Sequence, residues 1–204
     1  MKSGVISRSG LLLGLAGVMV VGLVTLVYHF THDAIVESEY QALLLALNSI
    51  IPEHSHDNDI VNDTRALPAS KELGLKKDAL IYRARNNGEI FAVAFPVVAP
   101  DGYSGPINLL LAIDQQGKIL GVRVVSHLET PGLGDRIESR RSDWLQQFSG
   151  KSVRDPSHKD WKVKKDGGIF DQFTGATITP RKIVNAVHRA LMYAEAEPGV
   201  FFDE

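Results

Sequence analysis

The longest apolar stretch of the chain lies near its N-terminus. Residues 11–28 read LLLGLAGVMVVGLVTLVY, and the 24 residues between Arg8 and Asp33 include no Asp, Glu, Lys or Arg. As a helix rising about 1.5 Å per residue they would extend roughly 36 Å, more than the hydrocarbon core of a bilayer at about 30 Å. The run is long for a signal peptide, and no A-x-A-like cleavage site follows it. The pattern predicts a transmembrane helix over residues 9–30 that contacts the lipid bilayer.

After this stretch, hydrophobic residues recur first at helical and then at strand spacing. Steps of three and four in residues 31–52 predict an amphipathic stalk helix that ends at Pro52, and the polar residues 53–70 predict a loop. Two hairpins follow, and together they predict an antiparallel sheet. Their strands are residues 79–85 and 89–98 around Asn-Asn-Gly, and residues 107–113 and 119–126 around Gln-Gln-Gly.

Helical spacing returns in the C-terminal part. A helix is predicted within residues 139–148, and a longer one from Pro180 to about Glu195 with Thr179 as its N-cap. Strands do not alternate with helices, and the chain contains no G-x-G-x-x-G dinucleotide fingerprint. The predicted fold class is therefore α+β, with an N-terminal transmembrane helix followed by an antiparallel-sheet domain and flanking helices.

Charge sets the orientation and excludes one class of partner. Lys2 and Arg8 precede the span, and no base recurs until Arg65, so the positive-inside rule places the N-terminus in the cytoplasm. Without these two bases the chain has 20 Lys and Arg against 24 Asp and Glu, a net charge of −4, which argues against nucleic-acid binding. The prediction is a single-pass inner-membrane protein with residues 1–8 cytoplasmic and residues 53–204 forming a periplasmic domain.

The chain contains no cysteine, which excludes disulfides, Cys-ligated iron–sulfur clusters and thiol catalysis. A redox role would therefore require an organic cofactor. Residues 54–59 (HSHDND) include four side chains of the types that bind metals. They lie in a polar stretch with no fixed geometry, so no metal site is predicted.

The most informative segment is DQFTGATITP, residues 171–180. A helix start offers unpaired N–H groups and positive partial charge, which can hold a phosphate, and the small Gly175 and Ala176 would allow close approach. The same residues could form only a turn and a helix cap. On helix-start chemistry alone, that simpler interpretation is favoured.

Asp171, Thr174, Gly175, Ala176 and Thr177 form the motif Asp-x-x-(Ser/Thr)-Gly-Ala-Thr. With it the chain resembles the FMN-binding domain family shared by the G subunit of the Rnf electron-transport complex and the C subunit of the sodium-translocating NADH:quinone reductase. The spacing and flanks fit the former better. The resemblance implies FMN bound covalently to Thr177 through a phosphoester. It also implies a Mg²⁺-dependent flavin transferase, because a threonine hydroxyl is a poor unaided nucleophile.

Three other segments match the same family: DGYSGP (residues 101–106), HLETPGLG (127–134) and KKDGG (164–168). The resemblance implies that residues 127–134 pack against the isoalloxazine ring and hydrogen-bond its polar edge. Lys165 would neutralise phosphate or reduced-flavin charge, although a solvated surface lysine is equally compatible with the sequence. Besides Thr177, the cofactor-binding residues so implied are Thr174, Gly175, Ala176, Ile178, Glu129, Thr130, Leu133, Gly134, Tyr103 and Lys165.

The function implied by the resemblance is electron relay. The chain would be a membrane-anchored flavoprotein subunit within an ion-translocating ferredoxin:NAD oxidoreductase complex, with the other Rnf-type subunits as partners and no catalytic residue of its own. The alternative is a non-redox scaffold or assembly module, in which the Thr-Gly-Ala-Thr segment only caps a helix. Covalent flavin fluorescence under denaturing conditions separates these two hypotheses.

Overall fold

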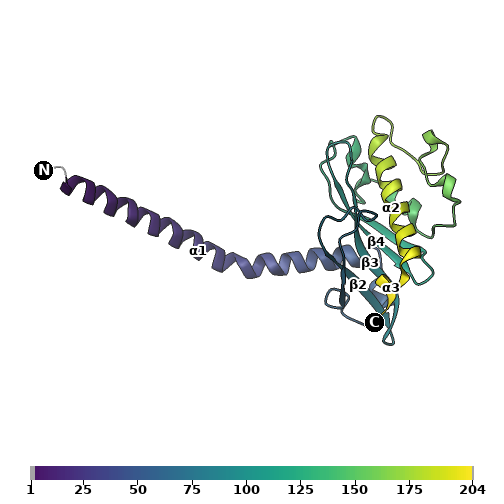
Figure 1. The fold of residues 1–204 in the computed structure, drawn as a ribbon, viewed down its shortest axis with the longest axis horizontal. Helices are drawn as coiled ribbons and strands as arrows, with labels where there is room; N and C mark the ends of the chain where they lie inside the picture. The colour runs from purple at the N-terminus through teal and green to yellow at the C-terminus, as the bar shows by residue number, and fades with distance from the viewer. Residues whose placement is uncertain (1–2, 204) are drawn as a thin grey trace. The chain divides into compact units, whose positions relative to one another are not determined.

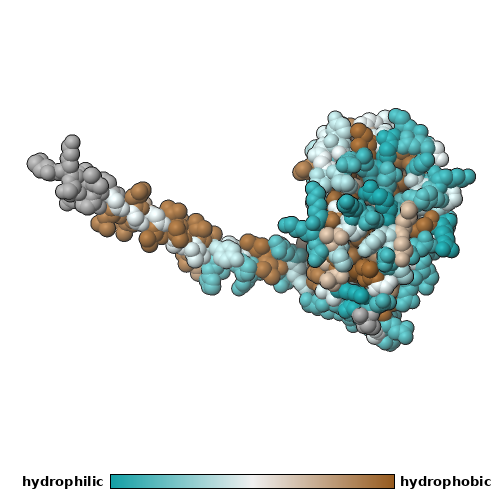
Figure 2. All heavy atoms as spheres, viewed as in Figure 1, coloured by the Kyte–Doolittle hydropathy of each residue, from teal (hydrophilic) through white to brown (hydrophobic). Residues whose placement is uncertain are grey.

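The computed structural model describes residues 3–203, with side chains described from Gly10 onward. Helix α1 spans Ser3–Asn48 without interruption. The large hydrophobic side chains from Leu11 to Phe30 are exposed, and Figure 2 shows them as a brown band along the helix. The predicted apolar helix is confirmed, and its length and composition suffice to cross a membrane.

The chain divides into two units, Met1–Leu43 and Leu44–Glu204. The last turn of α1 belongs to the second unit, where Leu47, Ile50 and Ile51 are buried. Ile50 lies against Gly121, where a Cβ atom would come within 2.9 Å of the Ile50 Cα atom. Only a residue without a side chain allows this contact. The sequence predicts that the domain starts at residue 53, but the compact unit of the structure starts earlier, at Leu44.

The second unit is built on a five-stranded antiparallel sheet in the order β1-β2-β3-β4-β5. Both predicted hairpins are confirmed. The prediction of an uninterrupted loop over residues 53–70 is wrong, because β1 pairs with β2 from Thr64↔Tyr82 to Leu67↔Ala79. A four-residue edge strand with polar Thr64 and Arg65 is too short to show alternation. The strands are β1 (Thr64–Leu67), β2 (Ala79–Asn86), β3 (Glu89–Ala99), β4 (Ile107–Asp114) and β5 (Ile119–Ser126).

Helix α2 (Ile178–Ala196) packs on β3 (Figure 1), and the short helix α3 (Pro198–Phe202) follows it. The predicted apolar face is confirmed, since Ile183, Val187 and Leu191 are buried. The predicted N-cap is wrong: Thr177 occupies that position. The Thr179 hydroxyl is buried and donates instead to the Glu129 carboxylate, so it does not cap the helix.

The helix predicted within residues 139–148 is also wrong in type and length. Only the 3-10 helix η3 (Trp144–Phe148) forms there, and its Trp144, Leu145 and Phe148 are buried. The preceding residues form a turn in which Arg141 and Ser142 N–H groups donate to the Glu138 carbonyl. The other 3-10 helices are η1 (Glu53–Ser55), η2 (Gly134–Ile137), η4 (His158–Asp160) and η5 (Lys164–Asp166).

An aromatic cluster joins η3 to the segment before α2. Phe148 packs against Phe170 with ring centroids 4.8 Å apart, and Trp144 contacts Phe173 at 5.4 Å. Trp161 packs on Phe170 at 5.0 Å. All five rings are buried, so this cluster supplies a rigid base for the loop that enters α2.

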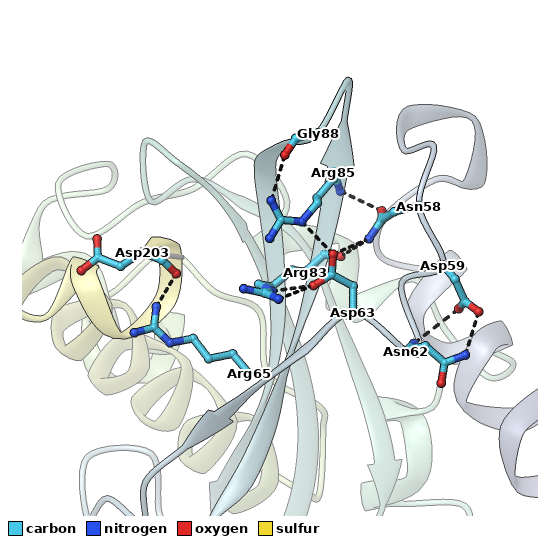
Figure 3. Close-up of polar contacts among 9 residues, drawn as sticks. All are labelled: Asn58, Asp59, Asn62, Asp63, Arg65, Arg83, Arg85, Gly88 and Asp203. Carbon is cyan, nitrogen blue, oxygen red and sulfur yellow. Dashed lines mark hydrogen bonds and ion pairs between the residues drawn. The ribbon is translucent and has the colours of Figure 1, made fainter.

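A polar network fixes the segment before β1 to strand β2 (Figure 3). The Asp63 carboxylate accepts hydrogen bonds from Arg83 at 2.6 Å and Arg85 at 2.7 Å. Asn58 donates to Asp63 and to the Arg83 carbonyl, and accepts from the Arg85 amide at 2.8 Å. Burial raises the pKa of Asp63, but the hydrogen bonds and charges of Arg85 and Arg83 outweigh it and hold the pKa below its ordinary value.

Replacing Asp63 with asparagine is expected to lower the free energy of unfolding by roughly 1–3 kcal/mol at pH 7, because two arginines lose a charged acceptor. The folded-state pKa of Asp63 lies below 3.8, so its contribution is full above that pH and is lost as the pH falls. Urea unfolding at pH 7 and pH 3 measures both effects. Asp59→Asn is the matched control, since that carboxylate accepts only within its own turn, from Val61 and Asn62. A control as destabilised as Asp63→Asn would contradict the assignment.

Candidate functional site

The Thr-Gly-Ala-Thr segment forms a tight turn that leads into α2. The Ala176 N–H donates to the Phe173 carbonyl at 3.2 Å, and Gly175 has a φ of +84°, a conformation that favours glycine. Thr177 is half-buried, and its side chain does not cap the helix. Within the described part of the chain its hydroxyl has no hydrogen-bond partner. The turn therefore presents a free hydroxyl directly at a helix start.

The residue that opens the motif, Asp171, is held on three sides. Its carbonyl accepts from the Trp144 indole N–H at 2.7 Å, and its N–H donates to the Gln147 side chain at 2.9 Å. Its carboxylate pairs with the Lys164 ammonium at 2.5 Å. Sequence reasoning missed Trp144 and Gln147, because neither lies near the motif in the chain. These contacts fix the Thr-Gly-Ala-Thr turn to the aromatic cluster.

Several cations lie around the start of α2. The Lys165 N–H donates to the Gln172 side chain at 3.1 Å, while its ammonium group forms no ion pair with any described residue. Arg181 donates two hydrogen bonds to Asp166, at 2.5 and 2.9 Å. This pairing lowers the pKa of Asp166 and raises that of Arg181. Among the described residues near the turn, Lys165 is therefore a cation without an ion-pair partner.

The predicted ring-packing loop, residues 127–134, lies close to the Thr-Gly-Ala-Thr turn. The N–H groups of Leu133 and Gly134 both donate to the Thr130 carbonyl, at 3.2 and 3.1 Å. Leu133 is 47% exposed, and its Cδ2 atom lies 3.7 Å from where a Cβ on Gly175 would stand. The structure therefore brings Leu133, Gly134 and Gly175 together. The Thr130 side chain is exposed and makes no hydrogen bond to a described residue.

The loop between β3 and β4 reaches the same region. A Cβ on Gly105 would lie 3.3 Å from the Leu128 Cδ1 atom, so this loop packs on the ring-packing loop. Tyr103 at its tip is 68% exposed. Leu128 and Ile178 are exposed as well. Exposed apolar side chains therefore lie on both loops and at the start of α2, the segment that carries the free hydroxyl, and such surfaces suit a flat aromatic ligand with a phosphate tail.

Glu129 has a different setting from the one implied by the sequence. Its side chain is only 4% exposed, and it accepts hydrogen bonds from the Ser104 N–H and the Thr179 hydroxyl. Neither of these partners was among the predicted site residues. Nothing in the local sequence pattern indicates that Thr179, 50 positions away, supplies a partner.

Comparisons with known proteins agree with this geometry. A model of the FMN-binding domain matches residues 102–192, and a model of the RnfG N-terminal region matches residues 1–50. The G subunit of the ion-translocating oxidoreductase complex of Pseudomonas aeruginosa is 51% identical over 189 residues, covering 93% of this chain and 88% of that protein. The chain belongs to the G-subunit family of ion-translocating oxidoreductase complexes. The family resemblance stated from the motifs is therefore confirmed.

A second relative and one solved structure are also similar to this chain. The corresponding G subunit of Vibrio parahaemolyticus is 47% identical over 188 residues, covering 92% of this chain and 89% of that protein. Among solved structures, NqrC of Shewanella oneidensis matches with a TM-score of 0.44 and 25% identity, over 67% of this chain and 65% of that one. The FMN-binding match runs from Gly102 through most of α2. It thus includes every residue predicted to contact the cofactor. Helix α1 is the apolar helix of the chain, which is thus a single-pass membrane protein of the ion-translocating oxidoreductase complex.

Proposed function

We propose that this chain carries FMN as a phosphoester on Thr177 and relays electrons through it within a membrane-bound, ion-translocating ferredoxin:NAD oxidoreductase complex. The observation that carries the proposal is the free Thr177 hydroxyl at the start of α2, within the stretch that the FMN-binding match covers together with the Tyr103 loop and residues 127–134. When bound, FMN supplies one- and two-electron chemistry, and the protein holds and tunes it.

The residues of the turn suit a phosphate. Attachment would replace the Oγ–H bond of Thr177 with an Oγ–P bond, while the phosphorus would lose its P–O bond to the donor's leaving group, which takes up the Thr177 proton. The chain would then gain the mass of FMN minus one water. Gly175 and Ala176 leave room for the phosphate oxygens. The N–H groups of Ile178 and Thr179 lie in the first turn of α2, where the helix favours negative charge. Because Thr177 has no adjacent base among its described contacts, a separate flavin transferase activates it.

The surrounding loops suit the flavin ring. Leu133 and Tyr103 offer exposed apolar surface for its faces, and the ring-packing loop offers backbone groups and the Thr130 hydroxyl for its polar edge. The Lys165 ammonium is free to balance phosphate or reduced-flavin charge. Thr174 is exposed on the turn itself.

The membrane helix sets where this chemistry takes place. The bases before the span and the acids after it orient the FMN-binding unit away from the cytoplasm. On that side of the inner membrane, a covalent link prevents loss of the cofactor. The other subunits of the complex then donate and accept the electrons, because this chain carries no dinucleotide motif.

The test uses the full chain, produced with the other subunits in a host that has a flavin transferase. We expect the band of this chain to fluoresce under ultraviolet light after denaturing electrophoresis. In the intact complex, we expect the flavin absorbance to bleach when reduced ferredoxin is added. A fluorescent band from a complex whose flavin on this chain is never reduced would contradict the relay. A colourless, unmodified band would favour the scaffold function instead.

A further inference from the structure

Two loops and the start of α2 meet at one buried carboxylate, that of Glu129. Glu129 Oε1 accepts from the Ser104 N–H at 3.2 Å, which ties down the loop that carries Tyr103. Glu129 Oε2 accepts from the hydroxyl of Thr179, two residues beyond the attachment residue. Glu129 itself lies in the ring-packing loop. One side chain therefore bridges all three segments of the proposed flavin site.

Two glycines enclose this carboxylate. A Cβ on Gly102 would come within 2.8 Å of Glu129 Oε1, and a Cβ on Gly134 within 2.7 Å of Oε2. Neither glycine has a positive φ, so the requirement at both positions is for space and not for backbone freedom. The DGYSG motif supplies Gly102 and the ETPGLG motif supplies Gly134. Both motifs therefore leave room for the Glu129 carboxylate.

The backbone of Glu129 is fixed as well. Its N–H donates to His127 Nδ1 at 3.0 Å, so the remaining ring nitrogen, Nε2, carries the proton that it donates to Glu138 at 3.0 Å. Both ends of Glu129 are thus oriented by hydrogen bonds. Among the described residues no Lys or Arg forms an ion pair with it, so hydrogen bonds must offset the cost of burying the carboxylate.

We propose that Glu129 is a positioning residue: its carboxylate clasps the Tyr103 loop and the start of α2 to the ring-packing loop and so fixes the flavin ring relative to Thr177. This inference rests on the proposed function. It departs from the implied role of Glu129 as a direct ring ligand, because the side chain is buried and its two oxygens each have a partner within the protein.

Side-chain chemistry distinguishes the two roles. The Ser104 N–H can only donate, whereas the Thr179 hydroxyl can donate or accept. Glu129→Gln can therefore keep both links, with its amide oxygen toward Ser104 and its NH₂ group toward Thr179. Glu129→Ala breaks both links. Thr179→Val removes only the hydroxyl of the helix link, and Thr179→Ser keeps that hydroxyl.

The experiment measures the visible circular dichroism and fluorescence anisotropy of the flavin in the full, flavin-loaded chain. We expect Glu129→Ala and Thr179→Val to lose most of the visible dichroism and to lower the anisotropy, because the ring becomes mobile on its tether. Glu129→Gln and Thr179→Ser should stay close to wild type. The Glu129→Ala/Thr179→Val double variant should be no worse than Glu129→Ala, since Glu129→Ala already breaks the link to Thr179 that Thr179→Val removes. Far-ultraviolet dichroism verifies the fold of each variant.

Two results would overturn the positioning role. In the first, Glu129→Gln loses as much visible dichroism as Glu129→Ala, while Thr179→Val alone stays like wild type. That pair of results would mean that the charge of Glu129 acts on the flavin itself. The other is wild-type dichroism in all variants. Loss of attachment in Glu129→Ala and Thr179→Val, with the Gln and Ser variants loaded, supports positioning of Thr177. A wild-type chain without flavin would instead contradict the proposed function.

Discussion

Replacing Thr177 with alanine is expected to abolish covalent flavin attachment completely while the fold stays intact. In the proposed function the oxygen of this hydroxyl bonds the phosphate, yet the hydroxyl makes no hydrogen bond in the described structure and does not cap α2. Its removal should change the free energy of unfolding by less than about 1 kcal/mol. In-gel fluorescence and intact mass measure the attachment, and thermal unfolding measures the stability.

The matched variant is Thr177→Ser, which keeps a hydroxyl at the same helix start and should remain modified. Peptide mass mapping of the wild-type chain locates the link independently. Thr179 is 1% exposed and donates to Glu129, so it is not available to a transferase. Thr174 is exposed on the turn. A flavin found on Thr174, or a Thr177→Ala chain that still fluoresces after denaturation, would show that the link is assigned to the wrong residue.

The elements that sequence reasoning found are those with a strong local signal. An uninterrupted apolar run predicted the membrane helix, and alternation bounded by Asn-Gly and Gln-Gly turns predicted β2 to β5 to within about one residue of their observed bounds. The elements it missed have little local signal. β1 is a four-residue edge strand that forms only because β2 lies beside it. In residues 139–148, the sequence contains no helix-breaking residue that would have shown that only the short η3 forms, from Trp144 to Phe148.

The site divides in the same way. The motifs pointed to Thr177 and to two loops that the FMN-binding match covers, and their contacts with the flavin stay predictions. The supporting contacts could not be predicted, because they join positions far apart in the chain. Thr179 gave the signal of a helix cap, since a threonine before a proline is a common helix start. Burial against Glu129 overrode that local preference, and the helix begins earlier.

Deleting the membrane helix tests where the compact unit begins. A chain that starts at Leu44 keeps Leu47, Ile50 and Ile51, which are buried in the domain, whereas a chain that starts at Glu53 lacks all three. Each buried aliphatic side chain contributes about 1.5–3 kcal/mol. Their joint loss, roughly 5–9 kcal/mol, is comparable to the whole stability of a typical domain at about 5–15 kcal/mol. We expect the first chain to fold and the second to aggregate.

The measurement is soluble yield followed by urea unfolding of both chains. Leu47→Ala in the longer chain is the graded control, and it should cost about 2–5 kcal/mol without preventing folding. Gly121→Val should mimic part of the truncation, because a side chain there displaces Ile50 from β5. Equal stability of the two chains would show that the last turn of α1 is not part of the folding unit and that the domain starts at residue 53, where the sequence places it. A folded chain only from Leu44 would mean that Leu47, Ile50 and Ile51 belong to the folding unit of the domain.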